Sequence, residues 1–398
     1  MNKEHEDTLV SDIGALQSYK IDIEQKTIDE WTADDPDRAA RRKKRRVPYE
    51  AWRSCFKHFD GTIYLADRNK SVDGGKSIIK HDISGLDNLT IHQFIGIPTP
   101  DKIDDRIPPG PGGFVLSRPG LFLGLDYRMY MDSPGVYRVR SWRSTDDLET
   151  INEGTVVVNV PGGPRRDRRP SEWYGLYVWR DVIEMPDGSL LATAHGNFEE
   201  DTIEPSSGPG KAETHYLCRT FVITSKDAGK TWDYLSTVAV PRIEDPVDEG
   251  FGEATVTLLD NGQLLCIMRT GHHRPMYACW SSDEGKTWTD PVYTGLERGA
   301  SPHLVKLGDG RLAVIYGIRF PAGWSRITPE GDHGRWDWPG AGLINLAINS
   351  DGTGHDWEVT TIGREMGSVY PTMFEVEPNV LFCQVDGWYW RVTLSPKR

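Results

Sequence analysis

Two octapeptides that share one pattern constrain this chain more than any other feature of its sequence. Residues 225–232 read Ser-Lys-Asp-Ala-Gly-Lys-Thr-Trp, and residues 281–288 read Ser-Ser-Asp-Glu-Gly-Lys-Thr-Trp. Both fit S-x-D-x-G-x-T-W, and their first residues lie 56 positions apart (281 − 225). Ser and Asp side chains bond nearby backbone N–H groups, Gly supplies a positive φ, and Trp covers the turn with apolar surface. The repeat therefore indicates an architecture built from one recurring hairpin unit.

Weaker copies of the octapeptide extend the series. Residues 144–151 keep the Ser, Asp and Thr, residues 350–357 keep the Ser, Gly and Trp, and residues 71–78 fit loosely. The octapeptide is the Asp-box, and with it the chain resembles the sialidase (neuraminidase) superfamily. Asp-boxes are stabilised turns, so they indicate architecture, and we do not expect them to contact a substrate.

Short apolar runs that follow a turn containing Gly or Asn recur along the chain and are typical of hairpin strands; four of these turns are Asp-Gly or Asn-Gly. Six such units, most of them followed by an Asp-box, predict an all-β fold with almost no helix. The specific prediction is a six-bladed β-propeller with Asp-box hairpins. We place the blades near residues 50–95, 105–152, 174–233, 250–290, 299–358 and 367–398.

The sixth unit is short, so we expect a strand from within residues 8–50 to complete it and close the ring. This divides the chain into a charged N-terminal arm, residues 1–46, part of which is the closing strand, and a propeller domain, residues 47–398. The basic run Arg38–Arg46 follows an acidic stretch. We interpret it as a solvated arm or an oligomer contact, with a nuclear signal as the alternative.

Composition excludes several classes of partner. The chain carries 46 Lys and Arg against 59 Asp and Glu, a net charge of −13, which argues against binding to nucleic acid. No stretch of 18 apolar residues is present, so we expect no membrane-spanning helix and no membrane partner. The charged start, Met1–Asp7, lacks an apolar segment, which predicts no secretory signal and a cytoplasmic location.

Cysteine and histidine spacing points to no metal site and no cofactor. The five cysteines are scattered without C-x-x-C spacing, so we interpret them as reduced, buried thiols. Histidines stand near strand ends at positions 195, 272, 273 and 303. They are more typical of hydrogen-bonded structural groups, although an acid or base role stays open.

Charged residues flank the apolar strands of the fourth and fifth units. Glu253 opens a strand, and Arg269 ends the strand that follows the next turn, which closely resembles the sialidase pattern. The alternative interpretation of this pair is a salt bridge across a hairpin. Arg319 likewise ends an apolar strand. Tyr370 opens the sixth unit, where the family places a Tyr, and its alternative is a core aromatic that packs between blades.

The resemblance implies a role for each of these residues. In the family, Arg side chains clamp the substrate carboxylate, because guanidinium is permanently charged and binds carboxylate through two bonds. A Tyr acts as nucleophile, since a carboxylate nucleophile would repel an anionic sugar. A Glu takes the proton of that Tyr, and a loop Asp serves as acid and then base. The implied catalytic residues are Tyr370, Glu253 and Asp73, and the implied substrate-binding residues are Arg53, Arg68, Arg269 and Arg319.

The match is weakest in the first unit. The family opens this blade with Arg-Ile-Pro, whereas Arg53 is followed by Ser and Cys. A literal Arg-Ile-Pro at residues 106–108 lies in a Pro-Gly loop of the second unit, and we interpret it as coincidence. Arg68 ends a strand that resembles the family's A-E-x-R ending. Asp73 follows it, in competition with the loose Asp-box at residues 71–78.

Further polar residues are candidates without a firm role. Arg180 and Asp181 follow Trp179 where the third unit opens, and Asp201 follows its inner strands as a rival acid. Asp386 ends the last apolar strand, where the family has a Glu, and the resemblance implies that it orients an Arg.

Three functions are compatible with these residues. The first is a glycoside hydrolase resembling exo-α-sialidases, which releases a terminal acidic sugar. The second is a hydrolase of the same clan that acts on a neutral or uronic sugar, as arabinanases or rhamnosidases do, with Glu253 paired to Glu199, Asp181 or Asp201. The third is a non-catalytic, glycan-binding propeller. In each case the expected partner is a glycan or glycoside.

Overall fold

The computed structural model describes residues 16–27, 54–67, 79–85, 89–95, 113–161, 176–203, 217–245, 247, 249–271, 274–319, 342–364, 370–385 and 388–397. Within these ranges the secondary structure consists of strands, and no helix occurs. The prediction of an all-β fold is therefore confirmed.

The strands form four sheets of four strands and one sheet of eight. The first small sheet runs in the order β2 (Ser54–Lys57), β3 (Ile63–Asp67), β5 (Leu89–Ile95), β4 (Ile79–Gly85). The second contains β14 (Gly252–Leu258), β15 (Leu264–Arg269), β16 (Tyr277–Ser281) and β17 (Val292–Tyr293). The third contains β18 (Gly299–Lys306), β19 (Leu312–Arg319), β20 (Gly342–Asn349) and β21 (Glu358–Arg364).

The eight-stranded sheet consists of two four-stranded antiparallel groups. The first group is β6 (Gly113–Arg118), β7 (Leu121–Ser133), β8 (Val136–Ser144) and β9 (Asn152–Asn159). The second group is β10 (Leu176–Glu184), β11 (Leu190–Gly196), β12 (Arg219–Ser225) and β13 (Thr231–Ala239). The last strands of the two groups, β9 and β13, pair in parallel, and this pairing merges the groups into one sheet.

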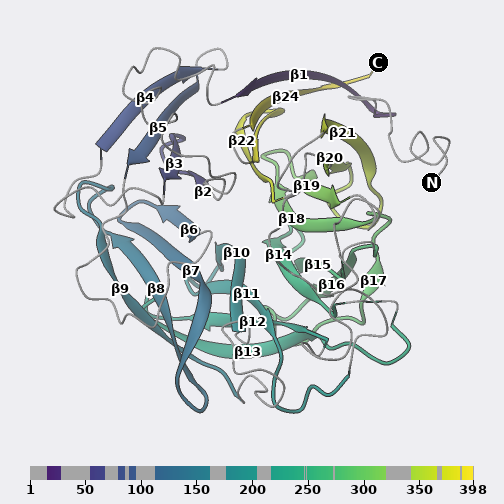
Figure 1. Ribbon diagram of the computed structural model, residues 1–398. Helices are drawn as coiled ribbons and strands as arrows, with labels where there is room; N and C mark the ends of the chain where they lie inside the picture. The colour runs from purple at the N-terminus through teal and green to yellow at the C-terminus, as the bar shows by residue number, and fades with distance from the viewer. Residues whose placement is uncertain are drawn as a thin grey trace, which may run out of the picture.

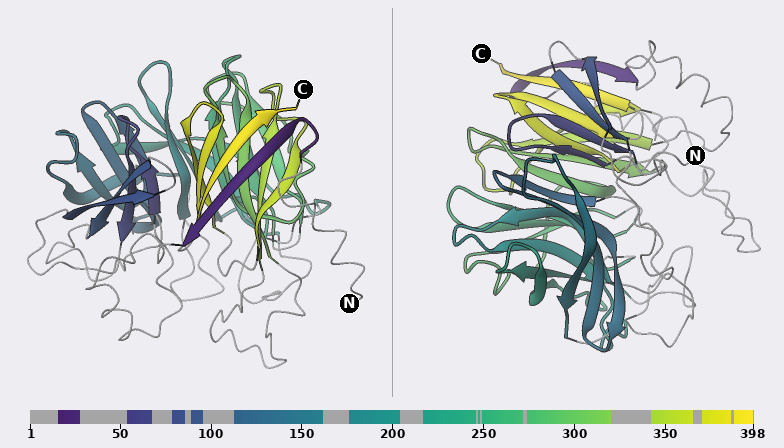
Figure 2. Two further views of the ribbon diagram at one scale, coloured as in Figure 1. Left: turned by 90° about the horizontal axis from the view of Figure 1, so that it is seen from above. Right: turned by 90° about the vertical axis from the view of Figure 1, so that its left-hand side faces the viewer.

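The last sheet joins the two ends of the described chain. It contains β22 (Thr372–Glu377), β23 (Val380–Val385), β24 (Trp388–Pro396) and β1 (Tyr19–Thr27). Strand β1 pairs antiparallel with β24, from Tyr19 opposite Pro396 to Thr27 opposite Trp388. Figure 2 shows β1 alongside β24 from two sides. A strand from the start of the chain thus supplies the outer strand of the last sheet.

The sheets are arranged around a common centre. The first strand of each four-stranded group (β2, β6, β10, β14, β18 or β22) lies on the inner side (Figure 1). Each of these strands contacts the next one around the ring, and β22 contacts β2. This arrangement brings the ends of strands from different sheets to the middle of the molecule.

The core lies between neighbouring sheets. Leu265 and Ile267 of β15 pack with Leu312 and Val314 of β19 in one buried cluster. Every residue of β11 and β15 is buried, because these strands are covered on both faces. Strands of this kind are continuous apolar runs without alternation, as in residues 264–268 of β15.

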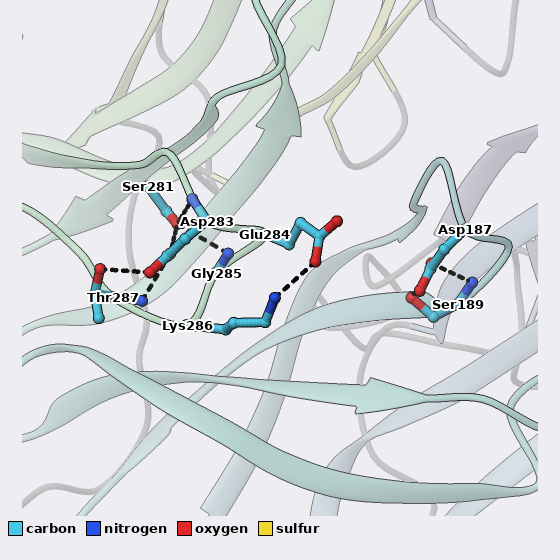
Figure 3. Close-up of polar contacts among 8 residues, drawn as sticks. All are labelled: Asp187, Ser189, Ser281, Asp283, Glu284, Gly285, Lys286 and Thr287. Carbon is cyan, nitrogen blue, oxygen red and sulfur yellow. Dashed lines mark hydrogen bonds and ion pairs between the residues drawn. The ribbon is translucent and has the colours of Figure 1, made fainter.

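The octapeptide turns connect the third and fourth strands of their groups. In the turn at residues 281–288, Gly285 N donates to Ser281 Oγ at 2.8 Å. Thr287 donates to Asp283 from its backbone N at 2.9 Å and from its Oγ1 at 2.7 Å (Figure 3). These bonds, led by the one from the Thr287 backbone, lower the pKa of Asp283 to about 2. The turn at 225–232 has the same bonds.

The weaker copies reproduce the turn with substitutions. In the turn at 144–151, Leu148 stands where the repeat has Gly, adopts a φ of 70° and donates its N–H to Ser144 Oγ at 3.0 Å. In the copy at 350–357, Gly354 N donates to Asn349 Oδ1 at 3.0 Å. The sequence pattern suggested Ser350 as the acceptor of this bond, but the acceptor is Asn349. Residues 71–78 lie outside the described residues.

Removing the Asp from one turn is expected to reduce stability. Asp283→Ala leaves the N–H and hydroxyl of Thr287 without their acceptor, so the melting temperature should fall by a few degrees. The matched control is Glu284→Ala in the same turn, because Glu284 bonds Lys286 on the surface (Figure 3). Thermal unfolding followed by circular dichroism measures both variants. Equal melting temperatures for the two would contradict the stabilising role of the turn.

Candidate functional site

Three inner strands carry an irregularity at corresponding places near the middle of the ring. The pairing register shifts between Trp179 and Val182 in β10, between Gly252 and Thr255 in β14, and between Ala300 and His303 in β18. Within these shifts, Arg180, Glu253 and Ser301 have φ values of 61°, 43° and 50°. Bulges re-aim side chains, and left-handed backbone at residues other than Gly gathers at functional sites. This region is therefore the candidate site.

Tyr370 and Glu253 meet in this region, as the resemblance predicts. Tyr370 lies just before β22, and its phenol donates a hydrogen bond to Glu253 Oε1 at 3.1 Å. Both side chains are half-buried. The two residues are 117 positions apart in the sequence, so the ring brings them together. A phenol that donates to a carboxylate has its proton acceptor already in place.

Arg269 is bound between two carboxylates. Its Nη1 lies 2.6 Å from Glu253 Oε1, and its Nη2 lies 2.8 Å from Glu249 Oε2. Only 6% of the Arg269 side chain is exposed. Burial by itself would lower the pKa of Arg269, but Glu249, Glu253 and Tyr370 raise it well above its usual value. Arg269 is therefore a fixed positive charge beside the Tyr370–Glu253 pair, and both its terminal nitrogens face protein carboxylates.

Aromatic rings pack next to Tyr370. The Trp179 ring meets Tyr370 edge-on at 5.9 Å and Tyr127 at 5.2 Å, and Tyr127 stacks on Tyr177 at 4.6 Å. Burial, followed by the nearby Tyr177 and Glu253, raises the pKa of Tyr127 well above its usual value. Tyr127 therefore stays a neutral phenol. The packed rings hold Tyr370 from the side of β10.

His195 lies on the other side of this aromatic group. Its ring is 5.3 Å from Tyr177 and 5.7 Å from Trp179. A Cβ on Gly252 would lie 3.3 Å from His195 Cδ2, so Gly252 allows the close approach of the imidazole. Burial is the largest cause that lowers the pKa of His195 to about 4. His195 is therefore neutral at pH 7.

The lowered pKa of His195 predicts a loss of stability in weak acid. An unfolded His has a pKa of about 6.5, so between that pH and about 4 the unfolded state binds a proton that the folded state does not. Stability therefore falls as the pH falls through this window, by up to about 3 kcal/mol from this group. Urea unfolding at pH 7 and pH 4.5 should show a smaller loss in His195→Asn than in the wild type. The exposed His355→Asn is the control, and an identical loss in both variants would contradict the assignment.

Other predicted residues are held by structural contacts. Arg180 donates from Nη2 to Ser301 O at 3.2 Å and to Ser301 Oγ, which connects the bulges of β10 and β18. Asp201 is buried and accepts both Nε, at 2.8 Å, and Nη2 of Arg219. This two-bond ion pair indicates a structural role for the rival acid. His303 Nδ1 accepts the backbone N–H of Met373 at 3.0 Å, which connects β18 to β22.

The remaining predicted residues cannot be placed around Tyr370. Asp181 lies in β10 and Arg319 ends β19, but their side chains are outside the description. The residues that lie outside the described ranges altogether are Arg53, Arg68, Asp73 and Asp386. Their assignments stay predictions.

Two residues of the site were missed by the sequence reasoning. Tyr127 follows the buried apolar run Leu121–Leu125 within β7, so the available signal was the polar triplet at residues 126–128 that interrupts this strand. Glu249 lies in the segment before β14 and carried no pattern.

Among the described residues, no group of His, Cys, Asp and Glu could hold a metal ion. A search of the same residues found no helix suited to crossing a membrane.

Comparison with known proteins places the chain in a family. A family model described as a BNR repeat-like domain matches residues 136–380, which is 245 of the 398 residues (380 − 136 + 1). No curated protein matches the chain. A crystal structure of a Dyadobacter fermentans protein of unknown function is 18% identical, with a TM-score of 0.52, over 87% of this chain and 94% of that chain.

Two further solved structures are similar at lower scores. The Hadza microbial sialidase Hz136 is 16% identical, with a TM-score of 0.46, over 71% of this chain and 52% of its own. The GH43 β-1,3-galactosidase BT0265 is 16% identical, with a TM-score of 0.42, over 71% of this chain and 55% of its own. The family match covers more than half of the chain and agrees with the resemblance that the octapeptides carry. The chain therefore belongs to the BNR repeat-like domain family.

Proposed function

We propose that this protein is a glycoside hydrolase that releases a terminal acidic sugar, with Tyr370 as nucleophile and Glu253 as its base. The observation that carries the proposal is the 3.1 Å hydrogen bond from the Tyr370 phenol to Glu253 Oε1. The pair lies between strands of different sheets, at the middle of the ring, where a substrate can be reached by residues from several sheets. Glu253 also has a left-handed backbone conformation within a bulge. Such strain gathers at functional sites, and a purely structural hydrogen bond would not require it.

We further propose that the ring is a six-bladed propeller with Asp-box turns. The support is the division of the strands into six groups of four, since the eight-stranded sheet contains two groups. The inner strands of these groups contact one another in a closed cycle. Four octapeptide turns connect the third and fourth strands of their groups, as Asp-boxes would.

The proposed chemistry has two steps. Glu253 takes the phenolic proton while the Tyr370 oxygen attacks the anomeric carbon and the bond to the leaving oxygen breaks. An acid, Asp73 by resemblance, gives a proton to the leaving oxygen. In the second step Asp73 removes a proton from a water that attacks the anomeric carbon, the bond to the Tyr370 oxygen breaks, and Tyr370 takes its proton back from Glu253. Arg269 stabilises the charge that develops between Glu253 and Tyr370. Arg53, Arg68 and Arg319 would bind the carboxylate of the sugar.

One observation favours the second candidate, a hydrolase for neutral or uronic sugars, and within it a neutral sugar. Both terminal nitrogens of Arg269 already face Glu253 and Glu249, at 2.6 and 2.8 Å. A substrate carboxylate would have to share Arg269 with two carboxylates of the protein. A sugar without a carboxylate at this position avoids that competition.

A panel of fluorogenic glycosides separates these candidates. The purified protein is assayed with a sialoside, an arabinofuranoside, a rhamnoside and a glucuronide at several pH values. Turnover of the sialoside alone supports the first candidate. Turnover of a neutral or uronic glycoside without the sialoside replaces it with the second. Absence of turnover, together with binding of glycans on an array, would make the protein a binding module.

A further inference from the structure

The backbone of Glu249 is fixed between two neighbouring segments. Glu249 N donates to Thr270 O at 3.2 Å, and Glu249 O accepts from Cys218 N at 2.9 Å. The next residue, Gly250, has a φ of +87°, and a Cβ there would lie 2.3 Å from the Cys218 backbone. Only glycine fits such a position. The segment that carries Glu249 is therefore held against the end of β15, where Arg269 lies.

The Glu249 side chain begins a row of charged contacts that ends at Tyr370. Glu249 Oε2 lies 2.8 Å from Arg269 Nη2, and Arg269 Nη1 lies 2.6 Å from Glu253 Oε1. Glu253 Oε1 accepts the Tyr370 phenol. The Glu249 side chain is 40% exposed, whereas those of Arg269 and Glu253 are 6% and 13% exposed. Glu249 thus reaches solvent, whereas Arg269 and Glu253 are largely enclosed.

We infer that Glu249 is a positioning residue that orients Arg269 and limits how strongly Arg269 attracts the Glu253 carboxylate and the Tyr370 phenolate. The inference rests on the proposed function, because it assigns that reaction a further residue. One guanidinium charge is shared between two carboxylates, so each carboxylate weakens the effect of Arg269 on the other. Without the charge of Glu249, Arg269 would stabilise the anionic forms of Glu253 and Tyr370 more strongly.

The first test measures Tyr370 without any substrate. Tyr370 is replaced by fluorotyrosine in the full chain, and the fluorine NMR signal is titrated with and without Glu249→Gln. The midpoint of the phenol titration should fall by about half to one pH unit when Glu249 loses its charge. Glu244→Gln is the matched control, because it removes the same charge from an exposed residue of the same segment. It should leave the midpoint unchanged.

The second test uses hydrolysis of whichever glycoside the protein turns over. The acidic limb of kcat/KM against pH should move to lower pH in Glu249→Gln, and Glu249→Asp should restore part of the original profile. A fluorine midpoint that does not move would overturn the inference, whether or not the protein is a hydrolase. A midpoint that moves in a protein without hydrolase activity would support the positioning role and reject the proposed function. A lower melting temperature with both titrations unmoved would reduce Glu249 to a structural residue and overturn the inference.

Discussion

Tyr370→Phe is expected to lower kcat/KM by about 10³-fold or more while the protein stays folded. The change removes one oxygen from a half-buried ring that stays packed against Trp179, whose centroid lies 5.9 Å away. Without that oxygen no bond can form between the enzyme and the anomeric carbon, so the double displacement is lost. Steady-state kinetics on the best glycoside, together with circular dichroism, measure the effect.

A matched control removes the same atom elsewhere. Tyr293 lies in the outer strand β17, is half exposed, and donates its phenol proton to Glu297. Tyr293→Phe therefore also breaks a phenol–carboxylate bond, but outside the candidate site. We expect its kcat/KM to equal that of the wild type. Turnover that survives Tyr370→Phe at the wild-type rate would exclude Tyr370 as nucleophile and direct attention to a pair of carboxylates.

Arg269→Met is expected to lower the free energy of unfolding by about 3–5 kcal/mol, more than the other substitutions proposed for stability measurements. The substitution leaves Glu253 and Glu249 next to each other without the cation that both contact, and Glu253 is 13% exposed. Removing one member of an enclosed ion pair leaves an uncompensated charge, which costs more than the pair contributes. Urea unfolding at pH 7 measures the difference.

The control for this prediction is an arginine on the surface. Arg242 contacts Asp290 at 2.7 Å, and its side chain is 59% exposed. Arg242→Met should change the free energy of unfolding by at most about 1 kcal/mol, because solvent screens exposed pairs. Similar losses in the two variants would mean that Arg269 is not compensating buried charge. Recovery of stability in Arg269→Met at low pH would agree with protonation of the two carboxylates.

The strand pattern and the pairing of distant residues were accessible from the sequence. Apolar runs behind Asp-Gly and Asn-Gly turns predicted strands, and the spacing of the octapeptides gave the order of the groups. The resemblance to the sialidase superfamily, applied in the register of the octapeptides, implied that Glu253 lies next to Tyr370. Both residues lie where inner strands begin, Glu253 at the start of β14 and Tyr370 just before β22, and this position allows the hydrogen bond between them.

The sequence could not predict the contacts of Arg269 with Glu249 or the stacking of Tyr177 on His195. Arg269 was expected to face a substrate, but Glu249 reaches it from a segment without strand periodicity. The contact between Glu249 and Arg269 depends on backbone hydrogen bonds that hold Glu249 against Cys218 and Thr270. No local sequence pattern predicts these long-range bonds. Likewise, Tyr127 approaches Trp179 because β7 is irregular between Leu125 and Met129. A bulge of this kind shifts the side chains away from the alternation that the sequence suggests.

The pairing of β1 with β24 has a consequence for how the chain is made. The first residue of this pairing, Tyr19, and its partner, Pro396, are 377 positions apart (396 − 19). During synthesis β1 emerges long before β24, its partner in the sheet. The sheet can therefore be completed only after β24 has emerged, by a contact of high sequence separation whose formation is slow. A circular permutant that joins the two ends would turn this late, long-range contact into a local hairpin, and it should refold faster.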